Sequence, residues 1–426
     1  MPNFRSLQKR VLFWTPDIRF LGKTVSFASW GGVVNWFLDR LAGKFTINRK
    51  VSDKIPAYSL ARDDQAKAKA IYQFVQDGFR YIDVGLGEGD YEPNDANTVL
   101  RRRYGDIKDF IVILTALLRA ANIEAYPALL RTRNFGPIVE QVITLRQFDH
   151  MIVAAIINGD TLYMDPTYST CPFKLLPPYA QDSYALILKK DNVSFQKTPV
   201  FPAALSDFRQ IYRIDFDPNG AVVVSGKVFA NGLVGDAFKT FAKVATKKDM
   251  RRWVEDYFNS HIPGIKLLRQ NFTSIHAQAQ KQDSSQAYVE GEFVFQYDNF
   301  FSSKDEMIFL TPNLLNKTRV PAFAINPEDE RIHPVVFDNK FVEWDKLTIR
   351  IPKGYDAFFI PSEEKMYEEF ATFKSSYARV EDTISLLRWF ELKTLSIKKE
   401  QYKALQEFYK KVAQADKREI IFRKRQ

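Results

Sequence analysis

Residues 108–121 are almost entirely apolar, and this segment constrains the fold more than any other part of the chain. A helix that is hydrophobic around its whole circumference must be covered on every side, so it belongs in the core of a domain. Asp106 stands just before the segment as a good N-cap, and Asn122 follows it as a plausible C-cap. The sequence therefore predicts a buried helix that starts near residue 107.

Short apolar strands follow this helix. We expect strands at residues 125–130, 151–157 and 161–164. The last two are joined by Asn158-Gly159-Asp160, which is a strong signal for a hairpin turn. An amphipathic helix is expected before them, starting at Asp63-Asp64. A buried helix followed by antiparallel strands is an α+β pattern.

The pattern changes near residue 205. Two strands at 211–216 and 222–229 flank the turn Asp217-Pro218-Asn219-Gly220, and this region is expected to form a β-sandwich with helical decoration. Further strands, an amphipathic helix and a short final strand follow residue 336. We therefore predict four parts: 1–55, the remnant of a preceding β-rich domain with a linker; 56–200, an α+β domain; 201–335, the β-sandwich; and 336–426, a C-terminal α+β region.

Three polar motifs lie in the predicted α+β domain: Tyr104-Gly105-Asp106-Ile107-Lys108-Asp109, Phe148-Asp149-His150 and Tyr163-Met164-Asp165-Pro166-Thr167. Their order and surroundings over residues 60–195 resemble the bacterial transglutaminase-like superfamily. That resemblance implies a papain-like fold with catalytic residues in the order cysteine, histidine, aspartate. It places His150 and Asp165 at the second and third positions, with Tyr104 and Asp106 beside the cleft. The flanking regions resemble β-rich domains of unknown function, and this resemblance implies that residues 1–55 are the tail of a preceding domain, most of which we expect to be missing from this sequence.

Residue 107 departs from the family pattern, because isoleucine stands where the resemblance implies the cysteine nucleophile. Isoleucine has no nucleophilic atom, so no acyl-enzyme can form at this position. Ile107 also continues the apolar helix stripe of Ile111, Leu114 and Leu118, which predicts a packing role. His150 and Asp165 would then remain as a hydrogen-bonded pair that orders the hairpin.

Cys171 is the only cysteine, and it is the one residue that could replace the missing nucleophile. A reactive thiol needs a setting that lowers its pKa, such as a helix N-terminus. Cys171 instead precedes a proline in a predicted loop. It is more simply a small, semi-buried thiol.

The composition limits the remaining possibilities. The net charge of +10 could favour an anionic polymer, yet no nucleic-acid-binding motif accompanies it, so we do not expect nucleic acid as the partner. One cysteine and four scattered histidines predict neither a metal site nor a disulfide, and no motif indicates a cofactor. No apolar run reaches the ~18 residues of a membrane span, and no signal peptide is visible as written.

The sequence leads to one main hypothesis and two alternatives. The main hypothesis is a catalytically inactive transglutaminase-like protein that binds a polypeptide or acts as a scaffold. The alternatives are an active cysteine hydrolase or acyl transferase that uses Cys171 with His150, and a basic surface module for anionic polymers. Related proteins are often exported, so the resemblance favours a periplasmic or cell-envelope location. The sequence predicts neither the partner's identity nor the oligomeric state.

Overall fold

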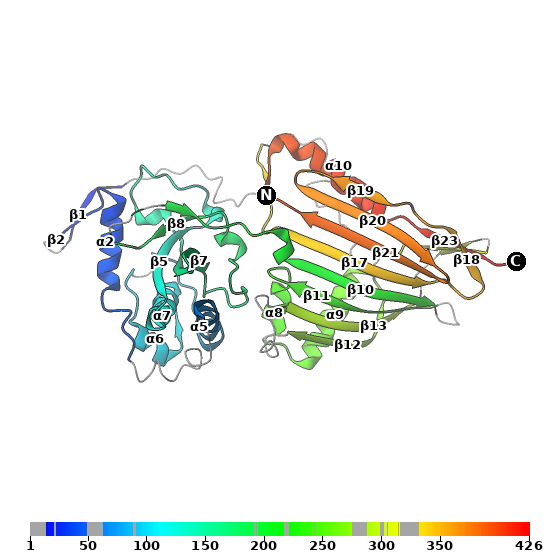
Figure 1. The fold of residues 1–426 in the computed structure, drawn as a ribbon, viewed down its shortest axis with the longest axis horizontal. Coiled ribbons are helices and arrows are strands. Elements are labelled where there is room, and N and C mark those ends of the chain that lie inside the picture. Colours follow the sequence, from blue (N-terminus) through cyan, green and yellow to red (C-terminus); the bar gives the residue numbers. More distant parts are fainter. Residues whose placement is uncertain are drawn as a thin grey trace. The chain divides into compact units, whose positions relative to one another are not determined.

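The computed structural model describes residues 14–20, 23–48, 63–87, 91–190, 193, 195–216, 221–242, 244–274, 288–298, 302–304, 306–313, 315 and 332–426. The chain forms two compact units, Pro2–Phe201 and Pro202–Gln426 (Figure 1). Both mix helices with mainly antiparallel sheets, so the expected α+β class is confirmed. Among the described helices, none combines the length and apolar character needed to cross a bilayer.

The first unit is built on a five-stranded sheet in the order β7-β6-β5-β8-β9, and all its neighbouring strands are antiparallel. These strands are β5 (Glu124–Arg131), β6 (His150–Ile157), β7 (Asp160–Met164), β8 (Tyr184–Ile187) and β9 (Phe195–Lys197). The turn between β6 and β7 has positive φ at Asn158 (55°) and Gly159 (86°). Two such residues define the turn that a tight hairpin requires, so the Asn-Gly signal predicted this connection correctly.

The predicted buried helix is α7 (Ile107–Ala120), and every residue from 107 to 118 is buried. It packs against β5 and β6, and α5 (Asp64–Gly78) and α6 (Ala96–Arg102) pack against it in turn. Its C-cap is Ala121 rather than Asn122, which follows in the left-handed conformation at φ 60°. Asparagine tolerates that conformation well, so it still ends the helix.

The opposite face of the sheet is also covered. Ala128, Leu130 and Ile152 point away from α7 and pack on Leu176 and Ala180, which belong to the long connection between β7 and β8. In the sequence, strands that are buried on both faces appear as continuous apolar runs rather than as an alternation of apolar and polar residues. The connection that covers this face also carries part of the site described below.

Helix α2 (Trp30–Leu41) belongs to the first unit. Its buried face, which includes Val33, Val34 and Phe37, lies in the same hydrophobic core as α7. The boundary predicted at 55/56 therefore does not separate this helix from the unit that follows. A short hairpin of β1 (Asp17–Phe20) and β2 (Lys23–Ser26) precedes it, while residues 49–62 lie outside the described part.

The second unit is built on an eight-stranded sheet in the order β12-β13-β11-β10-β17-β21-β20-β19. A four-stranded sheet, β14-β15-β23-β18, packs with it around a shared core that includes Ile214, Leu347, Ile308 and Phe422. The bounds are β10 (Asp207–Phe216), β11 (Val222–Asn231), β12 (Lys266–Ser274), β13 (Tyr288–Tyr297), β14 (Ser302–Lys304), β15 (Met307–Leu310), β17 (Phe341–Arg350), β18 (Tyr355–Phe359), β19 (Glu364–Tyr367), β20 (Ala371–Val380), β21 (Thr383–Leu392) and β23 (Ile420–Lys424).

The described part of the second unit also contains the α-helices α8 (Asp236–Ala242), α9 (Lys247–His261) and α10 (Tyr402–Asp416), and a ladder of β16 (Val335–Val336) paired with β22 (Ser396–Ile397). Inside this unit, Arg388 is only 1% exposed and donates to both carboxylate oxygens of Asp416 at 2.8 and 3.0 Å. Asp345 and Glu343 lie within 3.4 Å of the same guanidinium.

The boundary predicted at 335/336 does not divide compact units. Strand β10 pairs in parallel with β17, joining residues 207–214 to residues 342–349 within one sheet. The predicted β-sandwich and the predicted C-terminal region are thus parts of one structure. Strands β10 and β11 do form the expected antiparallel pair, and their turn, residues 217–220, lies outside the described residues.

Candidate functional site

Asp106 caps the N-terminus of α7. The Asp106 carboxylate caps it by accepting from the main-chain N–H groups of Lys108 (2.9 Å) and Asp109 (3.2 Å), and it also pairs with the Lys108 ammonium. Ile107 is thus the first helical residue, where unpaired N–H groups and the helix dipole favour a negative charge. Its side chain is 2% exposed and lies in the core with Ile111 and Leu114, which confirms the predicted packing role.

The other residues of this motif hold the start of the helix in place. A Cβ on Gly105 would lie 2.5 Å from the Asp109 Cβ, so only glycine allows this approach. The Asp109 carboxylate accepts from the main chain of Asn94 at 2.8 Å and from its side chain, while burial raises its pKa. These interactions are structural, so the motif does not by itself require a working nucleophile.

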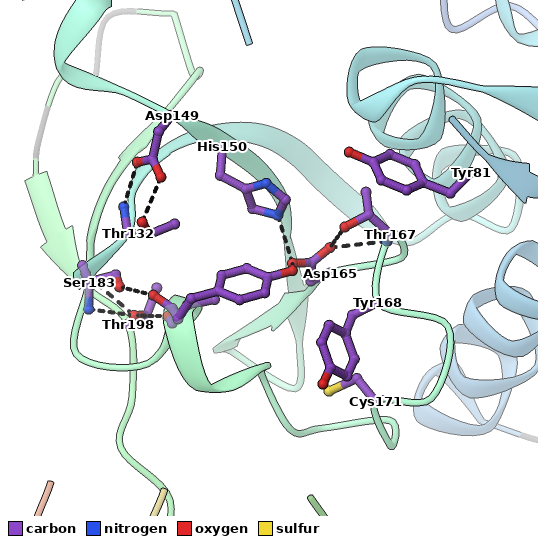
Figure 2. Close-up of polar contacts among 12 residues, drawn as sticks. Tyr81, Thr132, Asp149, His150, Asp165, Thr167, Tyr168, Cys171, Ser183 and Thr198 are labelled. Carbon is purple, nitrogen blue, oxygen red and sulfur yellow. Dashed lines mark hydrogen bonds and ion pairs between the residues drawn. The ribbon is translucent and has the colours of Figure 1, made fainter. Parts of the chain in front are cut away.

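The structure brings His150 and Asp165 together (Figure 2). His150 opens β6 and Asp165 follows the last residue of β7, so the hairpin places the two side chains on one side of the sheet. The His150 Nε2 lies 2.7 Å from Asp165 Oδ2. The Asp165 side chain is completely buried, whereas that of His150 is 12% exposed.

Further donors fix the Asp165 carboxylate. The Thr167 N–H and hydroxyl donate to Oδ1 at 3.0 and 2.6 Å, and the Tyr179 hydroxyl donates to Oδ2 at 2.8 Å. Burial alone raises the pKa of Asp165, but His150 and these donors bring it below its usual value. Burial alone lowers the pKa of His150, and the Asp165 carboxylate outweighs it, so the net shift is upward.

This pairing leaves the other ring nitrogen available. When Nε2–H donates to Asp165, the neutral imidazole has an acceptor at Nδ1. Among the described residues, no hydrogen bond to Nδ1 is present. The dyad therefore retains the arrangement in which a carboxylate orients an imidazole that could accept a proton.

His150 opens onto a cavity of about 410 Å³. Tyr81, Phe135, Tyr168 and Tyr179 provide its aromatic walls, and polar side chains fill the gaps between them: Asp83, Thr132, Asn134, Asp149 and Thr167. Tyr81 also connects this cavity to α7, because its ring packs edge-on against Phe110 at 5.5 Å and its strand pairs with Gly105.

The remaining predicted site residues are not among those that line this cavity. Ile107, Tyr104 and Asp106 do not line it, and Tyr104 is 41% exposed beside Arg80. Cys171 is 2% exposed, and its thiol donates to the Leu175 carbonyl at 3.4 Å. Figure 2 includes Cys171, and no contact joins its sulfur to His150. The thiol is therefore buried and outside the lining of the cavity.

A long connection between β5 and β6 forms one wall of the cavity. The buried Arg131 guanidinium donates to the carbonyls of Phe135, Gly136 and Gln147. The Gln147 side-chain amide accepts from the Val139 N–H and donates to the Val139 carbonyl. Loops this long are typically either functional or disordered, and these bonds hold this one in a single conformation. No local sequence signal marked Tyr81, Asp83, Phe135 or Tyr179 as lining residues, since three separate connections bring them together.

Among the described residues, no group of three or more His, Cys, Asp or Glu side chains is arranged to hold a metal ion. The site is thus an Asp–His dyad that opens onto an aromatic and acidic cavity. It can orient a ligand and accept a proton. The described residues place no nucleophilic thiol in the cavity lining.

Comparison with known proteins identifies two domains. The family model of the transglutaminase-like superfamily matches residues 53–158, so the chain carries a transglutaminase-like domain, as the motifs predicted. Asp165 lies just beyond the matched range. A second model, for a domain of unknown function (DUF3858), matches residues 306–422 in the second unit. No curated protein matches the chain.

A solved structure shares the fold. A candidate protease from Parabacteroides distasonis is 12% identical with a TM-score of 0.55, over 94% of this chain and 60% of that one. The present chain thus spans 60% of the length of that protein. A candidate cysteine protease from Cytophaga hutchinsonii is 21% identical over 32% of this chain and 42% of that one, with a TM-score of 0.23.

Proposed function

We propose that this chain, which carries a transglutaminase-like domain, binds extended polypeptides without cleaving or transferring them. The observation that carries the proposal is Ile107 at the first position of α7, where the resemblance to the family implies a cysteine. An aliphatic side chain offers no electron pair to a carbonyl carbon. Loss of the nucleophile removes nearly all chemical acceleration, while binding can persist.

The environment of Cys171 supports the same proposal over the cysteine-hydrolase alternative. Its thiol donates to a main-chain carbonyl and is almost fully buried, so it lacks access to a substrate. His150, the only predicted base, opens onto the cavity instead. An alternative enzyme would therefore need a loop rearrangement that brings the sulfur of Cys171 to His150.

The ordered cavity supports a role in binding. Its volume of about 410 Å³ falls within the range of about 300–1,000 Å³ that is usual for ligand pockets. Arg131 and Asp165 hold two of its walls through hydrogen bonds. Binding a ligand therefore costs little conformational entropy of the protein. The proposed location in a bacterial envelope rests only on the resemblance to exported proteins.

The test measures binding and turnover together. The full chain would be applied to an array of unstructured decapeptides, and the bound sequences would then be incubated with it and analysed by mass spectrometry. We expect binding to a subset of peptides, with no cleavage and no acyl transfer. Turnover that persists in a Cys171→Ser variant would overturn the proposal, and so would the absence of any peptide binding. Turnover lost in that variant would favour the hydrolase alternative.

A further inference from the structure

The cavity beside His150 is acidic, whereas the chain as a whole carries a net charge of +10. Asp83 and Asp149 both line it, and these two carboxylates and that of Asp165 all act electrostatically on His150. Among the described residues that line the cavity, none is lysine or arginine. Even with a protonated His150, the groups around the cavity carry an excess of negative charge.

The aromatic walls favour the same kind of ligand. Cations are attracted to the faces of tyrosine and phenylalanine rings, and the attraction is stronger where water is partly excluded. Tyr168 and Tyr179 pack edge to face at 6.1 Å, and Tyr179 packs in the same way on His150 at 5.2 Å. These contacts hold the rings in place, so the lining combines fixed π-faces with carboxylates.

The Asp149 carboxylate is fixed as well. The Thr132 N–H and hydroxyl donate to its two oxygens at 2.8 and 2.6 Å. Burial raises the pKa of Asp149 because the charged carboxylate loses water there. Arg131 acts on Asp149, but it does not line the cavity and its guanidinium donates to main-chain carbonyls. A cation within the cavity would compensate for the lost hydration of this carboxylate.

We propose that this cavity binds a basic side chain, lysine or arginine, of the captured polypeptide. This inference rests on the proposed function and adds a specificity to it. Asp83 is the outer carboxylate, since it is exposed and bonds only weakly to the Tyr81 hydroxyl at 3.3 Å. Asp149 is the inner carboxylate. The tyrosine rings contact the alkyl stem and the charged group of the bound lysine or arginine side chain.

The test compares two probes of the same shape, Nα-acetyl-arginine methylamide, which is charged, and Nα-acetyl-citrulline methylamide, which is neutral and carries an oxygen in place of one NH2 group. Ligand-observed NMR gives both dissociation constants for the full chain. We expect the arginine compound to bind at least about tenfold more tightly. Asp83→Asn and Asp149→Asn should each weaken it by about three- to tenfold and leave citrulline unchanged.

Asparagine has the shape of aspartate, its oxygen can still accept from the Thr132 N–H at position 149, and its NH2 group can donate to the Thr132 hydroxyl, so these variants should remain folded. Asp160→Asn is the matched control, since Asp160 is exposed at the far end of β7 and should change nothing. Equal binding of the two probes, or no effect of Asp83→Asn, would overturn the inference. If decapeptides still bound in that case, the proposed function would stand without the basic pocket. Arginine-selective binding without any peptide binding would sustain the cation site and overturn the proposed function.

Discussion

Replacing His150 with alanine should destabilise the first unit by an amount that depends on pH. The substitution removes the charged partner of a carboxylate that is completely buried and lies 2.7 Å from the imidazole. Breaking a buried pair in this way typically costs about 3–5 kcal/mol. Thr167 and Tyr179 still donate to Asp165, so we expect a smaller loss of about 2–3 kcal/mol at the most favourable pH.

The sign of the pH dependence follows from the two shifts. The pKa of His150 is raised in the folded state, so its contribution is complete below the unfolded value of about 6.5 and disappears as the pH rises through the folded value. The pKa of Asp165 is lowered, so its contribution is complete above about 3.9 and disappears as the pH falls through the folded value. The pair should therefore contribute most between about pH 4 and 6.5.

Urea unfolding, read by pulsed hydrogen exchange on peptides that contain residues 150–165, would report on this unit alone. His150→Gln is the matched control, because its amide can donate to Asp165 without carrying a charge. The difference in unfolding free energy between wild type and either variant should decrease above about pH 7, and glutamine should cost less than alanine at high pH. A difference that stays flat from pH 4 to 9, or grows with pH, would refute the reasoning.

Three further substitutions test other parts of the account. Gly105→Ala should destabilise the first unit by about 2–4 kcal/mol, because the new methyl group overlaps Asp109 and breaks its bonds to Asn94; an unchanged urea midpoint would contradict this. Arg388→Met should cost the second unit about 3–5 kcal/mol, since it leaves the Asp416 carboxylate buried without its cation, and a loss below about 1 kcal/mol in urea unfolding would show that the network is dispensable. Cys171→Ser should change stability by less than about 1 kcal/mol and leave peptide binding intact, because a hydroxyl can donate to the same Leu175 carbonyl; loss of binding in the array assay would give the thiol a role.

Local patterns predicted the first unit well. The all-apolar segment predicted α7, and the Asn158-Gly159 turn fixed the register of β6 and β7. Once that register was correct, the placement of His150 and Asp165 followed, because both lie at the same end of the hairpin. Local patterns do not place Ile107 near His150. That placement follows from the family resemblance, and it remains a prediction.

Contacts between distant segments were not predictable from local patterns. The parallel pairing of β10 with β17 joins segments more than a hundred residues apart, and neither strand's alternation specifies its partner. The predicted boundary at 335/336 was therefore misplaced. Tyr179 joins the dyad only because the connection after β7 folds back over the sheet, and a single tyrosine in a loop carries no signal of that path.

The most direct test of the central claim is the alkylation rate of a cysteine placed at residue 107. Iodoacetamide would be applied at neutral pH to an Ile107→Cys, Cys171→Ser variant, in which the new thiol is the only one, and to the same chain with His150→Ala. We predict that the first reacts at least about tenfold faster than the second, because the thiol lies in the same place in both variants and only the imidazole differs. Equal rates in the two variants would show that residue 107 does not face the imidazole and would contradict the account of a silenced nucleophile position.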